Sequence, residues 1–368
     1  MRILLDYRSA LRQRTGVGEY AHQLATALAR PESPGRITLF SSSWKDRLAP
    51  GAVPGAATLD KRIPVTLLNL AWHRMGWPPV EALGADADVA WSLHPLLMPA
   101  RRAAQVVTVH DLYFLDHPDA TAREVRRDYA MLAQTHVRRA DGVIVNSEYT
   151  KGLVRTRFGV PEDRVTVCYP GAPAWRVREE PAAPGPILHV GTIEPRKNVA
   201  ALIKAYLTLA SERPATPPLV LAGRMAEPFA VLTAGDESEI YRARVTFLGY
   251  VSDQQRVELF RDASMLVVAS ADEGFGLPAL EAMTIGLPVV AARRGSLPEV
   301  LGQAGILVDP DDRAAFAAAM CRLLDDGALR REQAAKGVKR ASDFNWEASA
   351  AQLVGAFRKA IARRGLRR

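Results

Sequence analysis

Two glutamates, Glu273 and Glu281, stand eight positions apart on either side of the stretch "GFGLPAL". Two glycines and a proline disfavour a helix interior, so the two glutamates cannot lie on one continuous helix. A carboxylate accepts two hydrogen bonds side by side, which suits the vicinal hydroxyls of a ribose or a hexose. Glycines also let backbone N–H groups approach a ligand closely. The stretch therefore indicates a site for a ligand that carries sugar hydroxyls.

Two adjacent cations, Arg196 and Lys197, occur in a second stretch, "HVGTIEPRKNVAALIKAY". A strand-like run ends there at Gly191, and a helix is predicted to open around Asn198. Cations beside a helix N-terminus make a good diphosphate site. The alternative is an ordinary solvated pair of basic side chains. The two glutamates elsewhere in the chain favour the diphosphate.

The elements that must position these residues follow from the alternation of short apolar runs with helical stretches, which predicts parallel α/β architecture. Six strands are predicted in each half of the chain. They are 2–6, 36–41, 88–92, 105–110, 142–147 and 164–169, then 186–191, 218–223, 244–249, 264–270, 288–292 and 305–309. Residues 170–186 are rich in Pro and Ala, which is typical of a linker. We therefore expect two α/β domains of similar size.

Parallel α/β sheets bind ligands beyond the carboxyl ends of their strands. Glu273 follows the predicted strand 264–270, and Pro278 is well placed as the first residue of a helix. Glu281 would then lie in the first helical turn, where the helix dipole favours a carboxylate. Both carboxylates are thus expected to face one cleft between the domains.

The length of 368 residues is typical of two domains, and the net charge of +8 is concentrated near the C-terminus. Six basic residues follow Glu347, the last acidic residue, and without them the net charge is +2. They are Arg358, Lys359, Arg363, Arg364, Arg367 and Arg368. This tail could attract anionic lipid or nucleic acid, or it could complement the end of a final helix. Its shortness and lack of interleaved aromatic residues argue against nucleic acid.

A second basic region lies in the first half of the chain and favours a membrane surface or an acidic acceptor. It comprises Arg123, Arg126, Arg127, Arg138 and Arg139. Cys168 and Cys321 are too few for a disulfide framework or a metal cluster. The N-terminus does not resemble a signal peptide, and no apolar run is long enough to span a bilayer. These features predict a cytoplasmic protein, with peripheral contact at the inner face of the membrane through its basic regions.

The segment "EGFGLPALE" resembles the E-x7-E motif of retaining glycosyltransferases with the two-domain GT-B fold, specifically glycosyltransferase family 4. The stretches "GTIEPRKN", "FLGYVSDQQ" and "GLPVVAARRGSLPEVLGQAGILVDPDD" look like accompanying motifs of that family, in its usual order. Upstream, "TGVGEYAHQLATAL", "VHDLYFLDHP" and "VNSEYTKGLV" extend the resemblance across essentially the whole chain. It implies an α/β protein with two Rossmann-like domains facing across an interdomain cleft. We expect an acceptor-side domain at 1–175, a nucleotide-sugar domain at 176–345, and a helix at 346–368 that packs back on the first domain.

The resemblance implies transfer of a sugar from a nucleotide-sugar donor with retained anomeric configuration. Glu281 would hold the donor ribose, and Glu273 would hold hydroxyls of the sugar without any covalent role. Lys197, helped by Arg196, would neutralise charge on the departing diphosphate. The family often has Arg directly after the glycine of the strand-end turn, where this chain has Thr192. Backbone groups of Gly191, Gly274, Phe275, Gly276 and Leu277 would line the sugar and phosphates.

Other donor contacts are implied by matching positions elsewhere. Tyr250, Val251 and Ser252 match a loop that contacts the nucleobase. Gly16 and Gly18 match a loop that reaches the donor from the opposite domain, after domain closure. His110 matches a position close to the reacting sugar and the acceptor, although a lone buried His is more often structural. The expected catalytic set is Glu273, Lys197, Arg196 and His110, with no metal and no cofactor.

Four alternative interpretations share parts of these patterns. "GVGEYA" at 16–21 fits a dinucleotide fingerprint, but the next strand lacks the acidic residue that a ribose requires. "DAD" at 86–88 resembles a metal-binding pair, but its position where a helix end meets a strand favours solvated turn residues. A nucleotide-sugar epimerase of the same fold, or a non-catalytic binder of sugar nucleotides or nucleic acid, would share parts of the pattern. Dependence of the product on an added acceptor separates a transferase from both.

The donor and acceptor are suggested by residues 63–83, an apolar stretch that carries Trp72 and Trp77. Core packing explains it most simply, and contact with a lipid-linked acceptor at a membrane interface is the alternative. This stretch and "HDLYFLDHP" resemble bacterial mannosyltransferases that build O-antigen, capsule or other exopolysaccharide. GDP-mannose is therefore the preferred donor, ahead of UDP-glucose and related UDP-hexoses.

Overall fold

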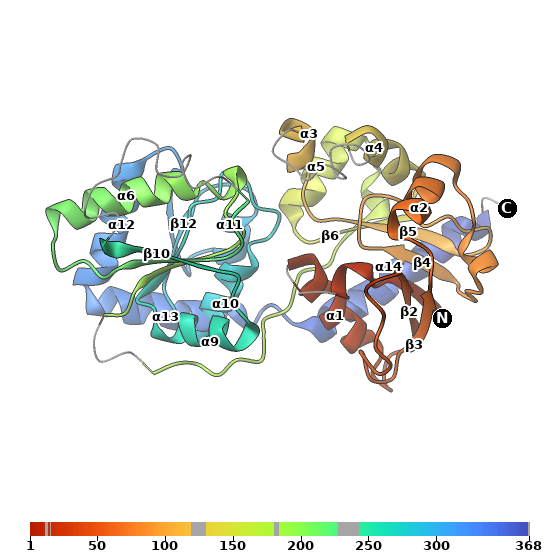
Figure 1. The fold of residues 1–368 in the computed structure, drawn as a ribbon, viewed down its shortest axis with the longest axis horizontal. Helices are drawn as coiled ribbons and strands as arrows, with labels where there is room; N and C mark the ends of the chain where they lie inside the picture. Colours follow the sequence, from red (N-terminus) through yellow and green to blue (C-terminus); the bar gives the residue numbers. More distant parts are fainter. Residues whose placement is uncertain (12–13, 15, 119–129, 180–183, 227–242, 367–368) are drawn as a thin grey trace. The chain divides into compact units, whose positions relative to one another are not determined.

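The computed structural model describes residues 1–368 apart from 12–13, 15, 119–129, 180–183, 227–242 and 367–368. The chain forms two compact units (Figure 1). The first comprises Met1–Gly171 together with Asn345–Arg368, and the second comprises Ala172–Phe344. The sequence-based boundaries, after 175 and after 345, lie within four residues of these divisions. Arg123, Arg126, Arg127, Arg367 and Arg368 of the predicted basic regions lie outside the described residues.

The first unit contains a seven-stranded parallel sheet in the order β3-β2-β1-β4-β5-β6-β7. Its strands are β1 Arg2–Asp6, β2 Arg36–Ser42, β3 Ala57–Lys61, β4 Val89–Ser92, β5 Ala104–Val109, β6 Gly142–Val145 and β7 Val165–Val167. The six strands predicted for this half are all present. The strand β3 was not predicted, because it is a polar edge strand whose residues are exposed or half-buried.

Helices cover both faces of this sheet. One face is packed by α1, Gly16–Leu28, and α14, Trp346–Leu366, which lie side by side (Figure 1). The other carries α4, Ala130–Arg139, and α5, Glu148–Phe158. Shorter helical segments are η1 Arg8–Ala10, α2 Val65–Leu70, η2 Ala71–Met75, η3 Val80–Leu83, α3 Tyr113–Asp116 and η6 Glu162–Arg164.

The last helix, α14, is held in the first unit by its apolar face. Leu353 and Phe357 are fully buried, and Ile361 packs partly buried against the same core. The Phe357 ring lies 5.4 Å from that of Trp91 on β4. These three side chains, four positions apart, lie on one face of the helix and share the core of the first unit.

The second unit contains a six-stranded parallel sheet in the order β10-β9-β8-β11-β12-β13. Its strands, all predicted, are β8 Ile187–Val190, β9 Leu219–Ala222, β10 Val245–Gly249, β11 Met265–Val268, β12 Val289–Ala292 and β13 Ile306–Val308. The central strands β11 and β12 are buried along their whole length, as in a sheet covered on both faces.

The helices of this unit lie on the two faces of its sheet (Figure 1). On one face α6, Val199–Glu212, packs with α12, Arg313–Asp325. On the other, α10, Leu277–Ile285, packs with α13, Gly327–Ala341, and with α9, Asp253–Asp262. The short segments η7, Pro195–Lys197, and α11, Leu297–Leu301, follow strand ends. Both units thus have the doubly wound Rossmann-like arrangement, with loops at the carboxyl ends of their strands available for ligands.

From Ala172 onward, the described part of the predicted linker, residues 170–186, belongs to the second unit. The Trp175 ring lies 5.6 Å from that of Phe260 on α9. The backbone N–H of Arg178 donates to the Ile285 carbonyl at 3.0 Å, and its guanidinium donates to the Arg261 carbonyl at 3.0 Å. Residues 172–179 thus belong to the second unit although they form no helix or strand.

Candidate functional site

Glu273 is bound by both cations of the predicted diphosphate site. It lies in the loop after β11 and is only 4% exposed. The Lys197 ammonium donates to the two carboxylate oxygens at 2.8 and 2.7 Å. The Arg196 guanidinium lies 3.4 Å from the same carboxylate and donates to Glu194 at 3.0 Å. The structure therefore brings together three of the predicted residues across 76 positions of sequence.

The electrostatics of this cluster keep the buried carboxylate ionised. Burial alone raises the pKa of Glu273, but the adjacent Lys197 and Arg196 outweigh it and hold that pKa below its ordinary value. The carboxylate in turn neutralises the cations. An incoming anion could take over one or both of them without any new charge being buried alone.

The loop that carries Glu273 is fixed by a turn that follows β12. The Ser296 backbone N–H and hydroxyl both donate to the Glu273 carbonyl, at 2.9 and 3.0 Å. Gly295 has φ +59°, and a Cβ there would lie 2.4 Å from the same carbonyl oxygen. The Ala271 N–H donates to the Arg196 carbonyl at 2.9 Å, which ties this loop to η7. Gly295 and Ser296 were not predicted as site residues.

Glu281 lies on α10, where the structure corrects one prediction. The helix begins at Leu277, Pro278 is its second residue, and its first turn contains no acidic residue. Glu281 is the fifth residue, so the helix dipole does not account for its stability. Its carboxylate instead accepts a hydrogen bond from the Arg256 guanidinium at 2.7 Å. The Arg256 guanidinium also lies 5.6 Å from the ring of Trp175.

Five more of the predicted residues of the second unit lie in the loop that leads into α10 and at the end of β8. Gly276, with φ +94°, caps α10, and a Cβ there would lie 2.8 Å from the Leu297 side chain. The Phe275 ring is buried edge-on against Phe344, at 5.6 Å, so its backbone alone can serve a ligand. Gly274 is buried and Leu277 half-buried in the same loop. Gly191 follows β8 and donates to the Ala222 carbonyl at 2.9 Å.

The predicted base-binding loop, Tyr250–Ser252, follows β10. Tyr250 is exposed and Val251 half-buried. The Ser252 hydroxyl accepts from the Gln255 N–H at 3.3 Å, and the Gln255 side chain accepts from the Ser252 N–H at 2.9 Å. Ser252 is therefore the N-cap of α9 in a capping box, and its hydroxyl already has a structural task.

His189, which was not predicted, is buried near the end of β8. Its charge interactions with Lys197 and Glu273 place it beside these two side chains. Its Nδ1 donates to the Val267 carbonyl at 3.0 Å, and within the described chain its Nε2 has no partner. Burial lowers the pKa of His189 to about 4, so the ring is neutral at pH 7. It could have been found from its place two residues before Gly191, near a strand end.

In the first unit, Gly18 has a structural reason to be glycine. It is buried in α1, and a Cβ there would lie 2.6 Å from the Ser9 carbonyl oxygen. Gly16 is the exposed first residue of the same helix. Residues 12–13 and 15 of the preceding loop lie outside the described residues.

His110 follows β5 in the first unit. Its Nε2 donates to the Leu93 carbonyl at 3.2 Å, and its ring meets that of Tyr20 edge-on at 5.3 Å. Burial lowers the pKa of His110 to about 4. The ring is therefore neutral at pH 7, with Nδ1 left as the hydrogen-bond acceptor.

A buried ion pair at the end of β1 was also missed. The Arg8 guanidinium donates to Asp6 at 2.6 Å and to Asn69 at 2.8 Å, and it lies 5.2 Å from the Trp72 ring. Burial raises the pKa of Asp6, but Arg8 outweighs it and lowers that pKa overall. The run "RILLDYR" places an acid at the end of a strand and a base two residues later, a signal that was available in the sequence.

The described residues also bear on the D-x-D at 86–88, on metal binding and on membrane-spanning helices. Asp86 and Asp88 of the D-x-D both bind the Arg2 guanidinium, as expected of surface turn residues. Within the described ranges, no group of three His, Cys, Asp or Glu side chains could hold a metal ion. The search of the described helices also found none long and apolar enough to cross a bilayer.

The two buried histidines predict a loss of stability in acid. The pKa values of His110 and His189 are about 4 in the folded protein, against an ordinary value of 6.5. The unfolded chain therefore binds more protons than the folded protein between these two pH values. The free energy of unfolding is therefore highest above about pH 6.5 and falls as the pH drops toward 4. Urea unfolding at pH 7.5 to 4.5 should show a shallower decline for His189→Phe than for the wild type. Parallel declines would contradict this.

The fold and this site together indicate the class of protein to which the chain belongs. Two Rossmann-like units, with acidic and basic side chains gathered at strand ends, are the architecture of GT-B glycosyltransferases. Sucrose-phosphate synthase from Thermosynechococcus elongatus has the same fold, with a TM-score of 0.78, 23% identity, and coverage of 98% of this chain and 99% of that one. So does Anabaena Alr3699/HepE in complex with UDP-glucose, with a TM-score of 0.69, 18% identity, and coverage of 96% and 99%.

Sequence comparison identifies the family. Residues 14–176 match the model of "Glycosyltransferase Family 4", and residues 185–326 match that of "Glycosyl transferases group 1". The O-antigen chain mannosyltransferase B of Escherichia coli is 31% identical over 365 residues, which cover 94% of this chain and 96% of that protein. The chain belongs to glycosyltransferase family 4 and is a glycosyltransferase.

Proposed function

We propose that this enzyme transfers mannose from GDP-mannose, with retention of configuration, to a glycan or lipid-linked acceptor in cell-surface polysaccharide synthesis. The cluster of Glu273, Lys197 and Arg196 at the strand ends of the second unit is the observation that carries the proposal. The choice of mannose is supported by the similarity to an O-antigen chain mannosyltransferase, which extends over 94% of this chain. UDP-glucose and related UDP-hexoses are the next candidates, since a structural relative has been solved with UDP-glucose.

In this proposal, donor binding redistributes the charges of the ion pairs at Glu273 and Glu281. The diphosphate takes up Lys197 and Arg196, Glu273 accepts hydrogen bonds from the sugar hydroxyls, and Glu281 accepts them from the ribose. Because these groups are buried or half-buried, their interactions with the donor are weakly screened by water. The loop of Gly274–Leu277, fixed by Ser296, presents its backbone to the sugar and phosphates.

The reaction itself is a substitution on one face of the sugar. The bond between the anomeric carbon and the phosphate oxygen breaks, and the acceptor oxygen bonds to that carbon from the same side. The acceptor proton passes to the departing phosphate oxygen. Negative charge grows on the diphosphate as its bond breaks, so preorganised cations lower the barrier.

Two of the expected catalytic side chains have restricted roles in this proposal. Both oxygens of Glu273 accept from Lys197, which supports a binding role over a nucleophilic one. His110 is neutral at pH 7, so we assign it hydrogen bonding to the reacting sugar or acceptor through Nδ1. We propose that no metal or other cofactor takes part, because Lys197 and Arg196 supply the positive charge. We place the enzyme in the cytoplasm, with peripheral contact at the inner membrane face and no nucleic-acid partner.

A transfer assay tests the proposal against its rivals. GDP-mannose labelled in the sugar is incubated with an alkyl mannoside acceptor in EDTA, and the products are followed by NMR. We expect label in the acceptor, an anomeric configuration equal to that of the donor, and no product without acceptor. A donor converted to another sugar nucleotide in the absence of acceptor would instead establish the epimerase. Loss of transfer in EDTA, restored by a divalent cation, would contradict the metal-free mechanism.

A further inference from the structure

Four large apolar side chains are exposed within eleven residues of the first unit. Leu67, Leu70, Met75 and Trp77 are 58%, 51%, 67% and 62% exposed. They belong to α2, η2 and the turn that follows. Scattered exposed apolar residues need no explanation, but such a concentration marks an interaction surface.

The same stretch is rigidly anchored, so the exposure is not that of a loose loop. Trp72 is buried, its indole N–H donates to the Pro78 carbonyl at 2.9 Å, and its ring lies 5.3 Å from Phe40. Gly76, with φ +65°, ends η2 and reverses the chain before Trp77. Core packing, the simpler interpretation of this stretch, therefore holds for Trp72, whereas Trp77 lies at the surface.

Basic side chains surround a pocket of about 380 Å³ beside Trp77. The lining includes Met75, Trp77 and Leu97 on the apolar side and Arg101, Arg139 and Arg364 on the basic side. Arg364, on α14, donates to the Ala100 carbonyl at 2.8 Å, which fixes the end of that helix at the pocket. Arg139 is exposed at the end of α4, and Arg101 is exposed in the segment before β5.

This combination fits an anionic lipid surface. Indole rings are favoured at the boundary between lipid head groups and acyl chains, and arginines attract anionic head groups. The nearby Glu81 carboxylate is occupied by the backbone N–H groups of Arg101 and Arg102, at 3.0 and 2.7 Å. We propose that the Trp77 surface, defined as Leu67, Leu70, Met75, Trp77, Arg101, Arg139 and Arg364, binds the surface of an anionic phospholipid bilayer.

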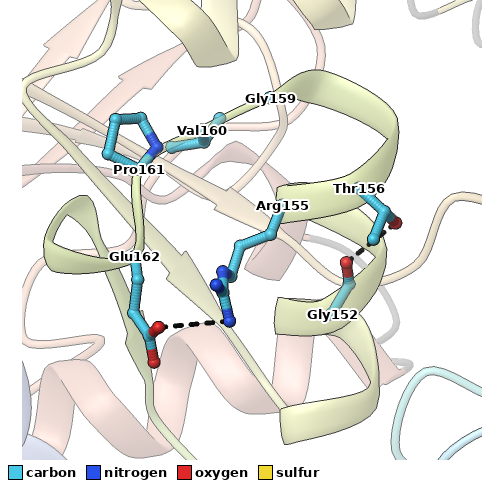
Figure 2. A pocket seen from close by; sticks show the side chains of 7 residues that line it. All are labelled: Gly152, Arg155, Thr156, Gly159, Val160, Pro161 and Glu162. Atoms are coloured by element: carbon cyan, nitrogen blue, oxygen red, sulfur yellow. Dashed lines mark hydrogen bonds and ion pairs between the residues drawn. The ribbon is translucent and has the colours of Figure 1, made fainter.

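A second pocket of the first unit differs from the pocket beside Trp77 in its lining and its charge. Figure 2 shows Arg155 reaching Glu162 across that pocket, and the two form an ion pair at 3.2 Å. Its remaining lining, from Gly152 to Pro161, offers no exposed large apolar side chain. The local charge is therefore balanced there, and Arg155 provides a matched control for the arginines of the Trp77 surface.

The proposal is tested by co-sedimentation of the full chain, without nucleotide, with phosphatidylcholine vesicles and with vesicles that also contain phosphatidylglycerol. We expect binding only to the anionic vesicles. The Arg101→Gln/Arg139→Gln variant should lower the partition coefficient roughly 25-fold, at about fivefold for each arginine. Met75→Ser/Trp77→Ser should also lower it, whereas Arg155→Gln and Trp44→Ser, at a 70% exposed tryptophan elsewhere, should not.

The possible results distinguish binding through the Trp77 surface from nonspecific binding and from loss of folding. Equal binding to both kinds of vesicle, wild-type binding by Met75→Ser/Trp77→Ser, or an equal loss in Trp44→Ser would overturn the proposal. Unchanged nucleotide affinity and melting temperature of each variant show that it is folded. Because vesicle binding is measured without substrate, this result does not depend on the proposed glycosyl transfer.

A second inference, carried by other contacts, concerns Arg256 and rests on the proposed function of Glu281. The guanidinium of Arg256 donates to the Glu281 carboxylate at 2.7 Å, and both side chains are largely buried. Its Nε is buried without a hydrogen-bond partner among the described residues. The Trp175 ring, 5.6 Å away, holds the guanidinium from another side. We infer that Arg256 is a positioning residue that orients the Glu281 carboxylate toward the ribose hydroxyls.

The test compares affinities for GDP and 2′,3′-dideoxy-GDP by calorimetry, because their ratio reports the ribose contact alone. Arg256→Leu should lower this ratio at least about fivefold relative to the wild type. Arg256→Lys, which retains the charge, should restore part of it. Arg261→Leu, on the same helix, should leave it unchanged.

Glu281→Ala distinguishes failure of the inference from failure of its premise. A wild-type ratio in Glu281→Ala would show that Glu281 does not hold the ribose, and the proposed role of that residue would fall. A ratio near one in Glu281→Ala, together with a wild-type ratio in Arg256→Leu, would overturn the role of Arg256 alone.

Discussion

Replacing Lys197 by alanine is expected to lower kcat by about 10²–10³-fold, the effect of removing one preorganised group that stabilises a developing charge. The lysine is half-buried and already held at 2.7 Å from Glu273, so little reorganisation is needed when the diphosphate arrives. Its contribution should grow as the glycosidic bond breaks, and turnover should therefore suffer more than donor affinity. Steady-state kinetics with separate calorimetry of donor binding measures the two effects.

A matched control comes from Lys204, on α6, which is not among the basic side chains that pair with Glu273 in the described chain. Lys204→Ala should retain wild-type kcat. The Lys197→Ala variant leaves Glu273 with Arg196 as its remaining basic partner, so its unfolding must be measured alongside. A Lys197→Ala enzyme that is folded and has wild-type kcat would remove the lysine from the mechanism.

Replacing Glu281 by alanine is expected to weaken donor binding by about 1–3 kcal/mol, the range for a lost charge-assisted hydrogen bond. The carboxylate is buried, and its orientation is fixed by Arg256 at 2.7 Å. Calorimetric titration with GDP measures the change. Part of the loss arises because Arg256 is left without its carboxylate, and Glu281→Gln separates this part by retaining an acceptor.

Glu258, exposed on α9, provides the corresponding control. Glu258→Ala should bind GDP as the wild type does. If Glu281→Ala also retained wild-type affinity, the assignment of Glu281 to the ribose would be wrong, whatever the effect on turnover.

The strands could be predicted from the sequence because buried parallel strands are continuous apolar runs bounded by Gly, Pro and polar residues. β11 and β12, "MLVV" and "VVAA", are clear cases. The missed strand β3, "ATLDK", pairs on one side only and contributes little to the core, so apolar patterning does not reveal it. The first turn of α10 was misplaced because helix boundaries depend on the cap at Gly276, which adopts a left-handed conformation.

The site could be predicted in part, since Glu273, Lys197 and Arg196 all follow strands that end at one edge of the second sheet. Arg256 could not, because it lies within a helix and meets Glu281 only through the packing of α9 on α10. Gly295 and Ser296 act through close backbone contacts with Glu273, which no spacing rule describes. His189 was not predicted because a single histidine in an apolar strand is most simply interpreted as a residue of the core.

Calorimetric titration of the wild-type protein with GDP, UDP and ADP, in EDTA, tests the central claim most directly. The claim is that the second unit binds a nucleoside diphosphate through Lys197, Arg196 and Glu281 without a metal. We predict binding of GDP with a clear preference over UDP and ADP. A preference for UDP would retain the enzyme class and discard mannose as the donor sugar. Binding of none of the three would contradict the account of the site.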